Sequence, residues 1–188
     1  MMPATRRGLL ALLVPLVVMT GCEGDPFEVP WALRPEESTL YALDRAELNR
    51  PSAFDMYERI GVVLEDPSVE GRWDFAVERQ AGVLHLLPPG YLGEPSGAGI
   101  VPMPGMTYDE LIEAPADTAL YVTREPVELA AGNVYVIRSH RQPDSFGFLC
   151  FYYGRIEALE VDHQEGILLF KHDRSPDCNN RRLIPPGT

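Results

Sequence analysis

The four histidines of the chain are its best candidates for acid–base or metal chemistry, because imidazole titrates near neutral pH and binds metal ions. They are His85, His140, His163 and His172. His163 and His172 flank a predicted turn beside three acidic residues, Asp162, Glu165 and Asp173, which raises the hypothesis of a small metal site. If Asp162 pairs with Ile167 across that turn, however, His172 lies well down the strand ladder from His163. We therefore expect solvated turn residues here and predict no metal ligand.

A second possible cation site is the segment 173–180, DRSPDCNN, whose carboxylate and amide oxygens are of the kind that Ca²⁺ takes as ligands. The segment lacks the regular alternation and the glycine of a dedicated calcium loop. Aspartate and asparagine beside proline more often form turns. We expect a turn, and the sequence predicts no metal and no cofactor.

The sequence has no motif for nucleophilic or phosphate chemistry. Ser96 and Ser145 lack the neighbours of a G-x-S-x-G nucleophile elbow. The glycines around Ala98 have no strand-to-helix context that would hold a phosphate. An enzyme would therefore have to use carboxylates, for example a pair about 5 to 10 Å apart across a cleft. The acidic residues of the loop 88–104 and its adjoining strands are the expected place for such a hydrolase or carbohydrate-active enzyme.

The first 22 residues carry the most specific pattern in the chain. Arg6 and Arg7 precede an apolar run over residues 9–19, and small residues follow before Cys22, which is the layout of a cleaved secretory signal peptide. The run is too short to span a bilayer, which takes about 20 residues. Its ending, Met-Thr-Gly-Cys at residues 19–22, resembles the lipobox of bacterial lipoproteins, with methionine where the family most often has leucine.

This resemblance implies that Cys22 receives a diacylglyceryl group, that cleavage removes residues 1–21 and that the new amino terminus is acylated. Three acyl chains would form a lasting membrane anchor. The alternative is an ordinary cleaved signal peptide followed by a chance cysteine. Glu23 is not the aspartate that retains lipoproteins at the inner membrane in the enteric pattern. The resemblance therefore favours the periplasmic face of the outer membrane of the cell envelope, with the outer leaflet of the cytoplasmic membrane as the alternative.

The chain is strongly acidic, with a formal net charge of −12, and loss of Arg6 and Arg7 with the leader takes the mature protein to −14. Such a surface repels nucleic-acid phosphates and anionic lipid headgroups. We therefore expect contact with the membrane only through the lipid anchor, a protein partner in the envelope, and no nucleic acid.

With Cys22 attached to lipid, Cys150 and Cys178 are the two cysteines that remain, in a chain exported to an oxidising compartment. We predict that they form a disulfide bond. The alternative, a thiol pair for metal or redox chemistry, lacks the C-x-x-C spacing that such sites use.

The domain plan follows from composition: a leader at 1–21, an acidic proline-rich tether at 22–37, one β domain at 38–184 and a short tail at 185–188. Short helical turns are predicted at 44–47 and 107–112 from capping-box spacing. The predicted strands, separated by turn signals, are 38–42, 53–56, 59–64, 73–78, 83–87, 119–123, 126–129, 133–139, 146–161 and 167–171, and the loop 88–104 contains at most a brief strand at 100–101.

Three features of these strands are specific. Residues 73–78 alternate apolar and polar and should form a hairpin with 83–87, with Asp74 on the wet face. Residues 134–137 are apolar on both faces, as in a central strand. Gly154 should mark a bulge or a bend in the long run 146–161. About nine or ten short antiparallel strands predict an all-β sandwich or barrel.

The aromatic group in the run 146–161 has two possible roles, since it can fill the core or line a ligand groove. Its members are Phe146, Phe148, Phe151, Tyr152 and Tyr153. We expect core and cross-strand packing. The sequence as a whole therefore predicts a lipid-anchored envelope protein whose non-enzymatic β domain binds another envelope component, with an envelope hydrolase as the alternative.

Overall fold

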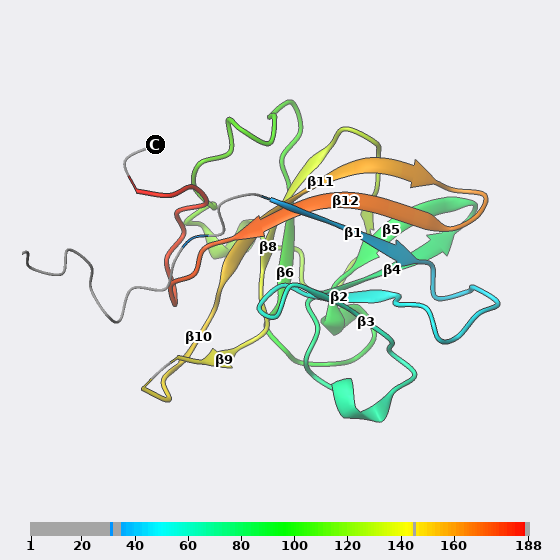
Figure 1. Ribbon diagram of the computed structural model, residues 1–188, viewed down its shortest axis with the longest axis horizontal. Coiled ribbons are helices and arrows are strands. Elements are labelled where there is room, and N and C mark those ends of the chain that lie inside the picture. The colour runs from blue at the N-terminus through cyan, green and yellow to red at the C-terminus, as the bar shows by residue number, and fades with distance from the viewer. Residues whose placement is uncertain (1–30, 32–34, 145, 187–188) are drawn as a thin grey trace, which may run out of the picture.

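The computed structural model describes residues 31, 35–144 and 146–186 (Figure 1). Cys22, the predicted leader and most of the predicted tether lie outside the described residues. Within the described ranges, none of the helical segments has the length and apolar character that crossing a membrane requires.

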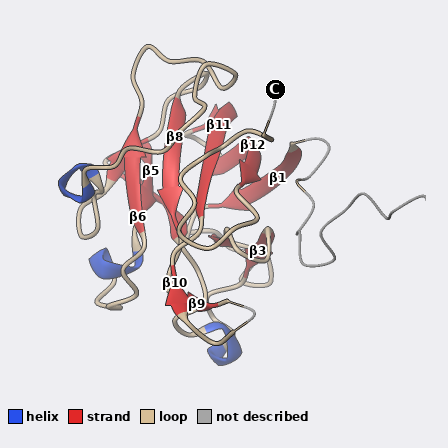
Figure 2. Cartoon of the chain, turned by 90° about the vertical axis from the view of Figure 1, so that its left-hand side faces the viewer, coloured by secondary structure: helices blue, strands red, loops and turns tan. Residues whose placement is uncertain are grey.

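Ten of the strands form two five-stranded antiparallel sheets that pack as a sandwich (Figures 1 and 2). The first sheet has the order β1 (Glu36–Tyr41), β12 (Ile167–Arg174), β11 (Tyr153–Asp162), β8 (Val134–Arg138), β6 (Gly99–Pro102). The second has the order β3 (Ile60–Val62), β2 (Ala53–Asp55), β4 (Phe75–Gln80), β5 (Val83–Leu87), β7 (Val127–Glu128). The predicted all-β class is confirmed, and the sandwich rather than the barrel is the form it takes.

The main core lies between the two sheets, because each strand turns its apolar alternate residues inward. Phe54 and Phe75 of the second sheet meet Phe170 of the first, with ring centroids 5.1 and 5.8 Å from that of Phe170. All three rings are fully buried. This cluster joins the sheets and places the ends of β2 and β4 next to each other.

The first sheet is covered on its other face as well. Val134 and Val136 of β8 pack there against Tyr108 and Leu111 of the loop after β6 and against Leu183 of the C-terminal segment. All five residues of β8 are buried, and the strand lies between β11 and β6. The prediction of a central strand covered on both faces is confirmed.

The hairpin predicted at 73–87 is confirmed, with β4 and β5 paired from Ala76 opposite Leu87 to Gln80 opposite Val83. Its two-residue turn has positive φ at Ala81 (50°) and Gly82 (83°), as the right-handed twist of a tight hairpin requires. The prediction that one face of the first strand is exposed to solvent was wrong at the start of the strand. Asp74 is completely buried, because a layer of apolar side chains including Trp73 covers the outer face of the second sheet here.

The predicted helical turns at 44–47 and 107–112 were wrong. Single 3₁₀ turns occur instead at Pro67–Val69, Pro89–Tyr91 and Thr118–Leu120. At the second predicted site the capping box does form, since Thr107 and Glu110 exchange hydrogen bonds. The helix does not follow, because the buried guanidinium of Arg155 takes the carbonyl oxygens of Tyr108 and Leu111.

The last two strands pair as predicted at their turn, with Asp162 opposite Ile167. The predicted bulge at Gly154 was wrong, because Gly154 pairs regularly and the register shifts between Ala158 and Glu160. Glycine is required at 154 for a different reason. A Cβ atom there would lie 2.7 Å from the carbonyl oxygen of Asp173, so a side chain would collide with the neighbouring strand.

Candidate functional site

Cys150 and Cys178 form a disulfide bond, with their Cα atoms 5.7 Å apart, as predicted. Cys150 ends the short strand β10 (Leu149–Cys150), and Cys178 lies in the segment that follows β12. Two hydrogen bonds between Phe151 and Asn179 run beside it, at 2.8 and 3.1 Å. The bond therefore ties the C-terminal segment to the base of the β10 strand.

Strand β10 pairs with β9 (Gln142–Pro143) in a small hairpin that joins neither sheet, and residues 142–150 are called the aromatic hairpin below. It projects from one end of the sandwich (Figures 1 and 2). Two hydrogen bonds from the backbone N–H groups of Phe146 and Phe148 to Oδ1 of Asp144 shape its turn. Both aromatic side chains point into solvent, with 82% and 71% of their surfaces exposed.

This exposure corrects the expectation that the whole aromatic group lies in the core. Tyr152 and Tyr153 are buried as expected, and Phe151 is half-buried. Phe146 and Phe148 are not, because the run 146–161 is broken between β10 and β11 and its first part leaves the sheet. Leu149, which is 66% exposed, extends the apolar surface at the tip.

A buried polar cluster lies at the base of this hairpin. Asp55 at the end of β2, Asp74 before β4 and His140 after β8 place one potential metal-ligand atom each within 4.8 Å of one another. All three residues are buried. The side-chain amide of Gln142, on β9, is hydrogen-bonded to Nε2 of His140, so the cluster contacts the hairpin directly.

Hydrogen bonds fix how each member is held. Nδ1 of His140 lies 2.7 Å from Oδ1 of Asp74, and since a carboxylate can only accept, this nitrogen carries a proton. Oδ2 of Asp74 accepts from the backbone N–H of Met56 at 2.6 Å. Oδ1 of Asp55 accepts from the backbone N–H groups of Tyr57 and Glu58. The carboxylates thus join three segments that are far apart in the chain.

Burial and mutual repulsion govern the protonation of the cluster. Burial, followed by the nearby charge of Asp74, raises the pKa of Asp55 to about 6, and the hydrogen bonds from Glu58 and Tyr57 oppose this only in part. Burial alone would lower the pKa of His140, but its hydrogen bond to Asp74 and the charges of both carboxylates outweigh burial and raise it. The cluster therefore places two carboxyl groups and one imidazole together in the protein interior.

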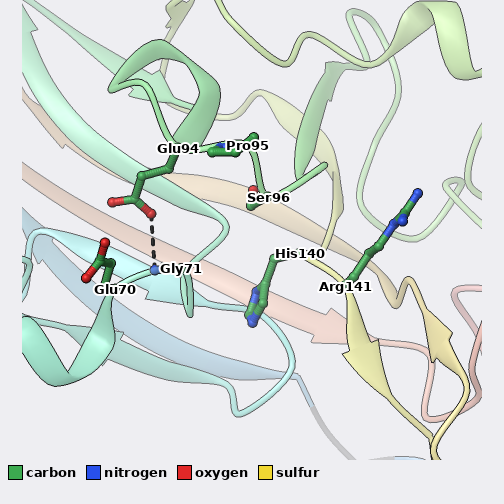
Figure 3. A pocket seen from close by; sticks show the side chains of 7 residues that line it. All are labelled: Glu70, Gly71, Glu94, Pro95, Ser96, His140 and Arg141. Atoms are coloured by element: carbon green, nitrogen blue, oxygen red, sulfur yellow. Dashed lines mark hydrogen bonds between the residues drawn. The ribbon is translucent and has the colours of Figure 1, made fainter.

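Two surface pockets open onto the cluster from different sides. His140 lines a pocket of ≈ 530 Å³ together with Glu70, Glu94 and Ser96 (Figure 3). Asp55 and Gln142 line a second pocket of ≈ 260 Å³. Figure 3 shows the imidazole of His140 extending away from Ser96, so these residues do not form a Ser–His–Asp arrangement.

Of the acidic residues expected for a hydrolase in the loop 88–104, Glu94 lines a pocket, and the second carboxylate there comes from outside that loop. Glu94, from the loop 88–104, and Glu70 line the same pocket, as Figure 3 shows. One oxygen of Glu94 accepts a hydrogen bond of 3.2 Å from the backbone N–H of Gly71. That bond fixes the loop 88–104 against the segment before β4.

The other three histidines form hydrogen bonds within the fold. Nδ1 of His163 accepts a hydrogen bond from the backbone N–H of Leu84, and Nδ1 of His85 lies 3.0 Å from the carbonyl oxygen of Val83. The expectation of a solvated residue was wrong for His172, which lies on β12, is completely buried and contacts Ser38. Within the described ranges, the turn at 162–167 and the segment 173–180 hold no group of three His, Cys, Asp or Glu ligands.

Sequence reasoning missed Asp55 and Asp74. One signal was available, because each aspartate stands among apolar neighbours, in Ala-Phe-Asp-Met at 53–56 and Trp-Asp-Phe at 73–75. A lone acid in such surroundings is buried with its neighbours when both faces of the strand are covered. Its partners could not be found in this way, since Asp74 and His140 are 66 residues apart.

No protein-family model matches this chain, and no curated protein matches its sequence.

Proposed function

We propose that the protein is a lipid-anchored component of the bacterial cell envelope that binds another envelope protein through the aromatic hairpin. The observation that carries the binding role is the exposure of Phe146 and Phe148 on a hairpin that belongs to neither sheet. Large exposed aromatic side chains are rare on isolated surfaces and are enriched where proteins bind one another.

Three further properties favour a protein over a lipid surface as the partner. Asp144 holds the backbone at Phe146 and Phe148, so less backbone ordering remains to be done when a partner binds. The disulfide at Cys150 fixes the base of the hairpin. The formal net charge of −12 repels anionic headgroups, which leaves the anchor at Cys22 as the proposed membrane contact.

Mass spectrometry of the protein purified from membranes tests the anchor. We expect an amino terminus at Cys22 that carries three acyl chains, because the residues before it resemble a lipobox. The Cys22→Ser variant should carry no lipid and should leave the membrane fraction. An unmodified amino terminus on the wild-type protein, or an intact leader, would contradict the proposal.

Site-specific photo-crosslinking in cells tests the hairpin. A crosslinking amino acid at Phe148 should capture one envelope protein, and the same group at Leu120, which is 51% exposed on another loop, should not. The Phe146→Ser/Phe148→Ser variant should lose that partner in co-purification. Its free energy of unfolding should change by no more than about 0.5 kcal/mol, because both side chains are exposed.

The outcomes of the crosslinking separate the possible occupants of the hairpin. Capture of the same protein from both positions would show that the contact is not specific to the hairpin. Crosslinks from Phe148 only to lipid, or only to a second copy of this chain, would contradict a distinct protein partner.

A further inference from the structure

We propose that Asp55, Asp74 and His140 form a binding site for a divalent transition-metal ion, with Zn²⁺ as the probe. Their ligand atoms lie within 4.8 Å of one another, so small side-chain movements would bring all three to the distance of about 2.0 to 2.2 Å at which Zn²⁺ binds. Two carboxylates and an imidazole are a mixed oxygen and nitrogen donor set, which suits Zn²⁺ better than the all-oxygen set that Ca²⁺ or Mg²⁺ prefers. The inference does not depend on the proposed role of the hairpin.

The charge of the cluster supports a cation. Asp74 is fully buried and Asp55 is 4% exposed. Among the described residues, Asp74 has an ion pair only with His140, and Asp55 has none within 4.0 Å. Two buried carboxylates with one imidazole leave an excess of negative charge, and buried charge is costly unless it is compensated. A divalent cation would supply the missing positive charge.

The arginine in the pocket beside Asp55 does not take this role. Arg72 lines the same pocket as Asp55, but its guanidinium donates a hydrogen bond of 2.6 Å to the carbonyl oxygen of Ser68. The arginine therefore stabilises the turn before β4 and makes no ion pair with either carboxylate of the cluster.

One free ligand oxygen, on Asp55, and a route to the surface are both present. The hydrogen bonds that Asp55 accepts from described residues go to Oδ1, so Oδ2 is left to bind an ion. Asp55 and Gln142 line one pocket and His140 lines the other, so an ion can reach the cluster without unfolding of the sheet. Nε2 of His140 now contacts the side-chain amide of Gln142. Rotation of that amide would release Nε2 to the ion and present the amide oxygen of Gln142 as a fourth donor, a number that Zn²⁺ commonly takes.

Hydrogen bonds already hold the two carboxylates, so a purely structural network is the competing explanation. The two explanations differ in one respect. A structural network gains nothing from added metal, whereas a metal site loses affinity when any ligand is replaced, even by an isosteric residue that keeps the hydrogen bonds to the backbone.

Isothermal titration of the purified full-length protein with Zn²⁺ tests the proposal. We expect one ion per chain and a rise in melting temperature on addition of Zn²⁺. Asp55→Asn and His140→Gln should each weaken the affinity by more than about tenfold, as the loss of a ligand does. The matched controls are Asp109→Asn, on an exposed turn, and His85→Gln, on β5, and both should bind Zn²⁺ as the wild type does.

NMR of the wild-type protein gives a test that does not depend on the folding of any variant. On addition of Zn²⁺, the ¹⁵N chemical shifts of the His140 ring nitrogens should change, and those of His85 and His163 should not. The proposal is overturned if the wild type shows no Zn²⁺ binding below millimolar concentration. It is equally overturned if Asp55→Asn and His140→Gln bind as the wild type does, or if another histidine shifts in place of His140.

Discussion

The double variant Cys150→Ala/Cys178→Ala is expected to have a free energy of unfolding about 3.5 kcal/mol below that of the wild type. The disulfide joins residues 28 positions apart, and a cross-link of that span removes this much loop-closure entropy from the unfolded chain. Alanine is preferred to serine because Cys150 is buried and a hydroxyl there would lack a partner. Urea unfolding at equilibrium measures the difference.

Reduction of the wild-type protein provides the control for this prediction, because it opens the same bond without changing a side chain. The reduced wild type and the double variant should lose similar stability. A loss below about 1 kcal/mol would mean that the hydrogen bonds between Phe151 and Asn179, with the packing of Leu183, already hold the C-terminal segment in place.

Between pH 7 and pH 4, His172 is expected to lower the free energy of unfolding of the wild type by about 3 kcal/mol, and the His172→Phe variant should not show this loss. Burial, followed by the charge of Arg59, lowers the pKa of His172 from 6.5 to about 4. As the pH falls below 6.5, the unfolded chain therefore takes up a proton at this site while the folded chain does not, and stability is lost until the folded pKa is reached. Phenylalanine titrates no proton, and the ring it replaces already packs against the rings of Phe54 and Phe170.

The quantity to measure is the difference in unfolding free energy between variant and wild type, at pH 7 and at pH 4. Asp55 acts in the opposite direction, since its raised pKa favours the folded state as the pH falls through about 6, but it is present in both proteins and cancels. Ser38→Ala is the control, because it removes the hydrogen bond to His172 and keeps the imidazole. A difference that does not change with pH would contradict the assignment to His172.

Patterns of neighbouring residues in the sequence predicted the hairpin, the buried strand and the last turn. The β4–β5 hairpin follows from alternation on both sides of a turn at Ala81 and Gly82. The apolar run 134–137 correctly indicated a strand covered on both faces. The pairing of Asp162 with Ile167 follows from a short polar turn. The hairpin and the turn depend on interactions within about ten residues, which sequence spacing reports directly, and the apolar composition of the run 134–137 reports its burial.

The errors have a common physical origin in contacts between distant segments. Arg155 takes the carbonyl oxygens that a helix at 107–112 would have used, and an outer apolar layer buries Asp74. Phe146 and Phe148 have the composition of core residues and are exposed because the backbone leaves the sheet before β11. Propensity carries no information about which distant group competes for a carbonyl or covers a face.

The sequence by itself determined the all-β class, the positions of most strands along the chain and the choice of Cys150 and Cys178 as partners, because periodicity and the number of cysteines are properties of the chain alone. Only the tertiary structure decided that Asp55, Asp74 and His140 meet, and that the aromatic hairpin stands clear of both sheets. Those features arise where two sheets close over one another, and the free energy that selects them comes from contacts between segments that the linear order keeps far apart.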